Sequence, residues 1–287
     1  MTKIKTQFID IDGAKLHYLE AGSGPVMLFL HGMPTSSYLW RNIIPILSDK
    51  AHCIAPDFIG MGKSDKPDIA YTVFDHIYYI EKLIEKLDLK NITLVMHGWG
   101  SVVGFDIASR QEDNIHALAF YEAHVRPSTE WDMLSLPVQQ LATLLHRPEV
   151  SYRAIVEQNY LIRRLLPSSV LRTLTAEEMQ RYEEPFMTPE DRKPLWQFIQ
   201  ELPLGHQEGE VVELIGRYNN WLRRTKLPKL MFYAIPGFIT TMESVRWSRE
   251  NLPKLTLIEL QNALHMAQET MPEFFAKELR DWFVQTF

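Results

Sequence analysis

The eight residues LVMHGWGS (residues 94–101) close an apolar run and lead directly into a segment with helical periodicity. A buried strand that ends at His97 and passes into a helix within three residues is the layout of a nucleophile elbow, a strained turn that carries a reactive side chain. The usual pattern is small-x-nucleophile-x-Gly, but the central position here is Gly98, which has no side chain. Ordinary tight turns between a strand and a helix share this spacing, so the turn alone leaves both interpretations open.

Strands and helices alternate on both sides of this turn. Several apolar runs show no polar alternation, which is typical of central strands that are covered on both faces. The predicted strands are 15–20, 25–30, 52–56, 91–97, 116–121, 229–235 and 255–260, and the predicted helices are 36–47, 74–87, 101–110, 208–224, 241–251 and 272–286. This order predicts an α/β fold with a mostly parallel, doubly wound sheet.

One long segment interrupts the alternation. Residues 127–204 contain no convincing strand, and their helical pattern is divided by eight prolines. A helical insertion between two strands of a parallel sheet predicts a cap over the carboxyl ends of the strands, where such sheets bind ligands. We therefore expect a main domain of residues 1–126 and 205–287 and a helical cap of residues 127–204.

Composition excludes several classes of protein. The chain has 287 residues, 30 Lys and Arg against 36 Asp and Glu, and a formal charge of −6, which argues against a nucleic-acid partner. Its apolar runs are far shorter than the ~20 residues that span a bilayer, so we expect no membrane association. The start of the chain has no apolar stretch of the signal-peptide kind. With Cys53 as the single cysteine, the expected location is the cytoplasm.

Three further segments place polar groups at the ends of predicted strands. His31-Gly32-Met33 follows an early strand at the place where α/β hydrolases carry one backbone N–H of the oxyanion hole, and Trp99 would supply the other. Glu122 ends the strand before the cap, and His265 lies between the last strand and the last helix. Elbow, acid and histidine occur in the chain order of the α/β hydrolases.

These residues, with several longer motifs, resemble the haloalkane dehalogenases and the related Renilla-type luciferases, from about residue 7 to about residue 283. The resemblance is carried by PTSSYLWRN (34–42), PDFIGMGKSDKP (56–67), WGS (99–101), EPF (184–186), PLW (194–196), LPK (227–229) and PG (236–237). It implies an α/β-hydrolase fold with an eight-stranded sheet and a helical cap after strand 6.

The family's chemistry identifies two departures in this sequence. An aspartate at the elbow forms a covalent ester with the substrate, a histidine oriented by an acid activates the water that hydrolyses it, and an asparagine and a tryptophan bind the halide. By position, the resemblance implies that His265 is the histidine, Glu122 the acid and Trp99 the tryptophan. The aspartate is replaced by Gly98 and the asparagine by Met33.

No other residue is a persuasive nucleophile. Cys53 is expected to be buried in a strand, Ser101 to point away from the site, Asp106 to pack on its helix, and Asp57 to support a loop. His124 could face the cavity, but a position on the surface at the edge of the cap is the preferred interpretation. The histidines lack metal-ligand spacing, and Gly98-Trp99-Gly100 lacks the third glycine of a dinucleotide fingerprint, so neither a metal nor a cofactor is expected.

Three hypotheses follow. The chain is an enzyme in which His265 and Glu122 form a base that activates water or abstracts a proton from a small, largely apolar molecule, without a covalent step. Alternatively, it binds a ligand in a lidded pocket without chemistry. In the third hypothesis it is an inactivated haloalkane dehalogenase, natural or engineered, and the double change Gly98→Asp and Met33→Asn would restore halide release. The oligomeric state is not predicted.

Overall fold

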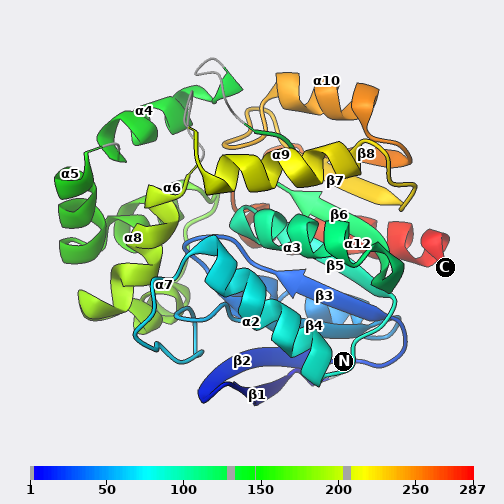
Figure 1. The fold of residues 1–287 in the computed structure, drawn as a ribbon, viewed down its shortest axis with the longest axis horizontal. Coiled ribbons are helices and arrows are strands. Elements are labelled where there is room, and N and C mark those ends of the chain that lie inside the picture. Colours follow the sequence, from blue (N-terminus) through cyan, green and yellow to red (C-terminus); the bar gives the residue numbers. More distant parts are fainter. Residues whose placement is uncertain (1–2, 128–132, 146, 203–207) are drawn as a thin grey trace.

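The protein, described here by a computed structural model of residues 3–127, 133–145, 147–202 and 208–287, contains one eight-stranded sheet (Figure 1). The strand order is β1-β2-β4-β3-β5-β6-β7-β8. β2 is antiparallel to both β1 and β4, and every other neighbouring pair is parallel. The strands are β1 Lys5–Ile11, β2 Ala14–Ala21, β3 Val26–Leu30, β4 His52–Pro56, β5 Ile92–His97, β6 Ile115–Tyr121, β7 Lys229–Tyr233 and β8 Leu255–Glu259. The predicted mostly parallel sheet is therefore confirmed.

Helices cover both faces of the sheet. One apolar core lies between the sheet and α2 Val73–Lys86, α3 Trp99–Arg110 and α9 Glu210–Leu222. A second lies on the opposite face against η1 Ser37–Trp40, α1 Ile44–Leu47 and α12 Pro272–Thr286. The remaining helices of this part are η2 Glu112–Asn114, α10 Met242–Asn251 and α11 Ala267–Thr270. Burial on both faces explains why β3 to β6 consist of nearly continuous apolar residues.

Between β6 and α9 the described residues form helices only, and we call residues 133–145 and 147–202 the cap. Its elements are α4 Leu136–Leu145, α5 Pro148–Tyr152, η4 Arg153–Glu157, η5 Leu161–Leu165, α6 Leu166–Ser168, α7 Ala176–Glu183, η6 Glu184–Phe186, η7 Glu190–Arg192 and α8 Lys193–Gln200. Figure 1 shows these helices gathered at one end of the sheet. The expected start of the insertion, residue 127, adjoins residues 128–132, and its expected end, residue 204, falls within residues 203–207; both of these ranges lie outside the described residues.

The structure differs from the sequence-based predictions of elements at several places. The predicted helix 36–47 is two short helices, η1 and α1, because Pro45 has no amide hydrogen with which to continue the first helix and lies in the first turn of the second. The edge strand β1 was not predicted at all. Its sequence KTQFIDI is largely exposed and polar, and it is held by pairing with β2 rather than by a pattern of its own. The strand predicted to end at residue 235 ends at Tyr233, shortly before Pro236.

Among the described residues, no helix has both the length and the apolar character needed to cross a membrane.

Candidate active site

The turn between β5 and α3 has the geometry expected of an elbow. Gly98 has φ 51° and ψ −124°, a conformation that residues with a side chain rarely adopt. Its carbonyl accepts a hydrogen bond of 2.6 Å from the hydroxyl of Ser101 one turn later. Position 100 has no room for a side chain, because a β-carbon at Gly100 would lie 2.3 Å from the carbonyl oxygen of Leu30. Close packing of α3 on β3 therefore holds the turn in place.

The space beside Gly98 is open toward His265. A β-carbon at Gly98 would lie 3.8 Å from Cε1 and 3.9 Å from Nε2 of His265, and 3.5 Å from Cα of Gly32. These are ordinary van der Waals distances, so the surroundings leave room for a side chain at this position. Such a side chain would point at the imidazole, which is the arrangement that a nucleophile and its base require.

His265 is hydrogen-bonded to Glu122 through the ring nitrogen that faces away from Gly98. Nδ1 of His265 lies 2.8 Å from Oε2 of Glu122, whose carboxylate is fully buried. A neutral imidazole that donates from Nδ1 carries its lone pair on Nε2, so the nitrogen nearer to Gly98 is the basic one. The expected pairing of these two side chains is therefore present, although they are 143 residues apart in the chain.

Backbone groups hold both members of the pair. The amides of Phe238 and Ile239 donate to Oε2 of Glu122 at 2.9 and 2.8 Å, and the amide of Thr240 donates to Oε1 at 3.2 Å. These bonds compensate the buried charge and fix the plane of the carboxylate. The carbonyl of His265 in turn lies 2.8 Å from Nε2 of His97, at the end of β5. The loop after β8 is thus tied to the elbow itself.

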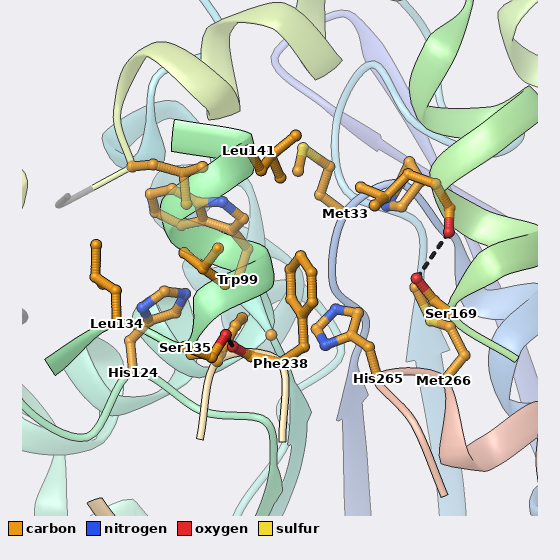
Figure 2. Close-up of a pocket in the computed structure, with 16 residues that line it drawn as sticks. Met33, Trp99, His124, Leu134, Ser135, Leu141, Ser169, Phe238, His265 and Met266 are labelled. Carbon is orange, nitrogen blue, oxygen red and sulfur yellow. Dashed lines mark hydrogen bonds between the residues drawn. The ribbon is translucent and has the colours of Figure 1, made fainter. Parts of the chain in front are cut away.

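A cavity of about 60 Å³ lies between this pair and the cap (Figure 2). That volume holds a few water molecules or a small organic group. Its walls are mostly apolar, and they are formed by Met33, Pro34, Gly98, Trp99, His124, Leu134, Ser135, Val138, Leu141, Leu165, Ser169, Leu202, Phe238, Ile239, His265 and Met266. We call it the inner cavity. All five predicted site residues except the buried Glu122 line it directly.

A second, more open cavity of about 370 Å³ adjoins the first. Five residues line both of them: Leu141, Leu165, Ser169, Phe238 and His265. Three of these five belong to the cap. The two cavities therefore meet between the cap and the loop that contains Phe238.

Among the described residues, no hydrogen-bond partner is found for two ring nitrogens of the inner cavity, Nε1 of Trp99 and Nε2 of His124. The preference for His124 as a surface residue was wrong, because its side chain is buried and lines the cavity. Burial, with a contribution from His265, lowers the pKa of His124 to about 4, so this ring is neutral at pH 7. The alternation of a strand could not have revealed this, because β6 ends at Tyr121 and Glu122 has a positive φ of 50°.

The side chains that were considered as substitute nucleophiles are engaged elsewhere. Ser101 donates to Gly98 and accepts from the amide of His124 at 3.0 Å. Cys53 is buried in β4, and burial raises the pKa of its thiol to about 12, which leaves it unreactive. Asp57 accepts bonds from His17, Ser37 and Lys63 in a loop under the cap. Asp106 pairs with Arg110 on α3.

Within the described part of the chain, no group of three or more His, Cys, Asp or Glu side chains is arranged to hold a metal ion.

The fold and the order of elbow, acid and histidine define an α/β hydrolase, and the sequence profile described as the alpha/beta hydrolase fold matches residues 25–272. The chain is 36% identical over 284 residues to a haloalkane dehalogenase of Mesorhizobium japonicum, covering 98% of this chain and 92% of the relative. A haloalkane dehalogenase of Bradyrhizobium diazoefficiens is 37% identical over 283 residues, with 94% and 91% covered.

Solved structures agree with these relatives. The crystal structure of haloalkane dehalogenase DbeA from Bradyrhizobium elkani superimposes with a TM-score of 0.95 at 34% identity, covering 99% of both chains. A putative ancestral haloalkane dehalogenase gives a TM-score of 0.94 at 37% identity, covering 98% of this chain and 99% of the other. The protein belongs to the haloalkane dehalogenase family of α/β hydrolases.

Proposed function

We propose that this chain is a cofactor-independent enzyme in which His265, oriented by Glu122, acts as a general base without a covalent nucleophile. The substrate is a small, largely apolar molecule. One observation carries the proposal. Nε2 of His265 lies next to the open space at Gly98, while Nδ1 is occupied by Glu122 at 2.8 Å. A basic nitrogen is therefore available in the cavity, at an elbow that has no nucleophilic side chain.

The proposed step is a single proton transfer to His265. Nε2 takes a proton from a water molecule that attacks the substrate, or from an acidic C–H or O–H of the substrate itself. The imidazolium that forms is stabilised by the buried carboxylate of Glu122, as the acid does in hydrolase triads. The backbone N–H groups of Met33 and Trp99 are the proposed donors to an oxygen that becomes negative. Met33 and Gly98 take the positions that the family resemblance assigns to the halide-binding asparagine and the nucleophilic aspartate.

A binding protein without chemistry is the second candidate. Its support is Nε1 of Trp99, which has no partner in the described part of the chain and which a bound ligand could satisfy with no reaction taking place. An inactivated dehalogenase is the third, supported by the relatives alone. Both candidates leave unexplained why the pair His265–Glu122 keeps its hydrogen bonds and its access to the cavity.

The test uses 4-nitrophenyl butyrate as a generic probe for base-assisted hydrolysis. We expect the unaltered chain to hydrolyse it and His265→Gln to lower kcat/KM by roughly 10²–10⁴-fold, the usual contribution of a positioned base. His116→Gln is the matched control, because His116 lies near the carboxyl terminus against Phe287 and its loss should leave the rate unchanged. Intact-mass spectra of quenched reactions should show no acyl group on the protein.

Three results would contradict the proposal. These are an unchanged rate in His265→Gln, a rate for the unaltered chain no higher than that of buffer, and a protein mass increased by one butyryl group. Release of bromide from 1-bromohexane by the unaltered chain would instead favour dehalogenation. Bromide release only after the double change Gly98→Asp and Met33→Asn would show that the older chemistry still fits the cavity.

A further inference from the structure

Nε2 of His124 is a buried polar atom in the mostly apolar wall of the inner cavity, and it has no partner among the described residues. The residue is 7% exposed, and this ring nitrogen is shielded from solvent and makes no hydrogen bond within the described part of the chain. More than nine in ten buried polar groups in proteins have a partner, since an unpaired one costs the free energy of its lost hydration. Because His124 lines the inner cavity, a molecule bound there can supply the missing partner.

The backbone of His124 is fixed on both sides. Its amide donates to Oγ of Ser101 at 3.0 Å, and its carbonyl accepts from the hydroxyl of Tyr218 at 2.5 Å. The imidazole packs against the indole of Trp99 with 5.7 Å between the ring centroids. Movement of the ring to solvent would break this packing, so the nitrogen remains at the cavity wall.

His124 and His265 present their rings at different points of the inner cavity wall. In the view of Figure 2 the rings of His124 and His265 lie on opposite sides of the Phe238 ring. Phe238 packs on His265 at 5.1 Å between ring centroids. A ligand in the inner cavity can therefore meet a basic nitrogen at one point and a second ring nitrogen at another, with apolar side chains between them.

We infer that His124, in the neutral tautomer that carries its hydrogen on Nε2, determines substrate specificity by donating a hydrogen bond to an uncharged oxygen, such as a ketone or ester carbonyl, at the opposite side of the inner cavity from His265. The inference rests on the proposed function and names its substrate class: an apolar compound with one hydrogen-bonding oxygen. An anion fits poorly, because the ring is neutral at pH 7 and the buried carboxylate of Glu122 is close enough to influence its titration.

The test compares two probes of the same shape, 2-pentanone and 2-methyl-1-pentene, in which CH₂ replaces the oxygen. Dissociation constants are measured by NMR titration for the unaltered chain, His124→Phe and His124→Gln. We expect the ratio of the ketone to the alkene constant to rise by about 3–10-fold in His124→Phe, as for the loss of one hydrogen bond. His124→Gln retains polar atoms that can bond the oxygen and should keep most of the preference.

The ¹⁵N resonance of His124 Nε2 gives an independent readout in the unaltered protein, and it should shift with the ketone and remain in place with the alkene. An unchanged ratio in His124→Phe together with an unmoved resonance would overturn the inference and leave a bound water as the partner of His124. Binding needs no turnover, so the outcome is independent of the test on His265. A ketone preference that depends on His124 would survive even if His265→Gln kept full activity.

Discussion

Gly98 combines an unusual backbone conformation with free space, and these two properties have separate energetic consequences. A side chain at φ 51° and ψ −124° is strained, whereas the atoms around its β-carbon would lie at ordinary contact distances. In a protein whose elbow bears a nucleophile, that strain is the cost of exposing a reactive group. Glycine removes the strain, so the elbow of this chain is relaxed.

Gly98→Ala therefore isolates the backbone strain. We expect a loss of about 1–3 kcal/mol in the free energy of unfolding, measured by urea denaturation. The matched control is Gly216→Ala in the interior of α9, where the nearest atom to a new β-carbon is Pro127 Cγ at 4.0 Å. Alanine is the better helix former, so this variant should gain about 0.5–1 kcal/mol. Equal effects of the two substitutions would show that the elbow imposes no special strain on a residue that has a side chain.

At the scale of secondary-structure elements, the contact between the cap and the main domain depends on a cluster of charged side chains around Glu269. Glu269 lies in α11 with its side chain fully buried, and it binds Arg41 of the segment after η1 and Arg172 of the cap. Nη2 of Arg172 is 2.6 Å from Oε2 of Glu269, and Nη2 of Arg41 is 2.9 Å from the same oxygen. Glu178 of α7 binds both arginines as well. The cluster joins segments on both sides of the cap boundary.

Removing the central carboxylate should loosen this contact. We expect Glu269→Gln to lower the free energy of unfolding by about 2–4 kcal/mol, because two arginines lose their buried partner while remaining partly exposed to water. Glu184→Gln is the comparison, since its pair with Arg181 is exposed on the surface and should change stability by less than about 1 kcal/mol. The free energies of unfolding of the unaltered protein, Glu269→Gln and Glu184→Gln are compared by thermal or urea denaturation. A loss no larger for Glu269 than for Glu184 would rule out a structural role for the cluster.

On the scale of the whole molecule, buried histidines make stability depend on pH. Burial lowers the pKa of His31, His76, His97 and His124, with His76 reaching about 3 from an ordinary 6.5. The folded state therefore keeps these rings neutral while the unfolded chain binds protons below pH 6.5. Stability from this source is complete above pH 6.5 and is lost as the pH falls toward the folded pKa values.

We expect the free energy of unfolding to fall between pH 7 and pH 5, and to fall less steeply in His76→Phe. The difference in slope should approach ~1.4 kcal/mol per pH unit below pH 6.5, the value for one proton. Phenylalanine is a suitable replacement because His76 stacks on Phe198 at 4.4 Å with an interplanar angle of 9°. Urea titrations at several pH values give the slopes. Parallel curves for the two proteins would mean that His76 binds its proton equally in both states.

The parts of the fold that were predicted correctly depend on local patterns. The apolar runs of β3 to β6 and the periodicity of α2, α3, α9 and α12 can be recognised in short windows of sequence, because burial on one or both faces selects the residues there. The edge strand β1 has no such pattern, since its neighbours in space rather than its own residues hold it extended. The break after η1 arose from a single proline inside an otherwise helical segment.

By itself, the sequence determined the fold class, the order of elbow, acid and histidine, and the absence of a side chain at Gly98, because each of these is a property of residue identity along the chain. Only the tertiary structure decided that His124 faces the cavity, that Nε2 of His265 borders the gap at Gly98, and that cap and main domain meet around Glu269. These depend on residues up to 228 positions apart in the chain being brought together, as Arg41 and Glu269 are. The neighbours of a side chain in space determine whether it is buried and where it points. A sequence pattern reveals these two properties only where those neighbours are also close along the chain.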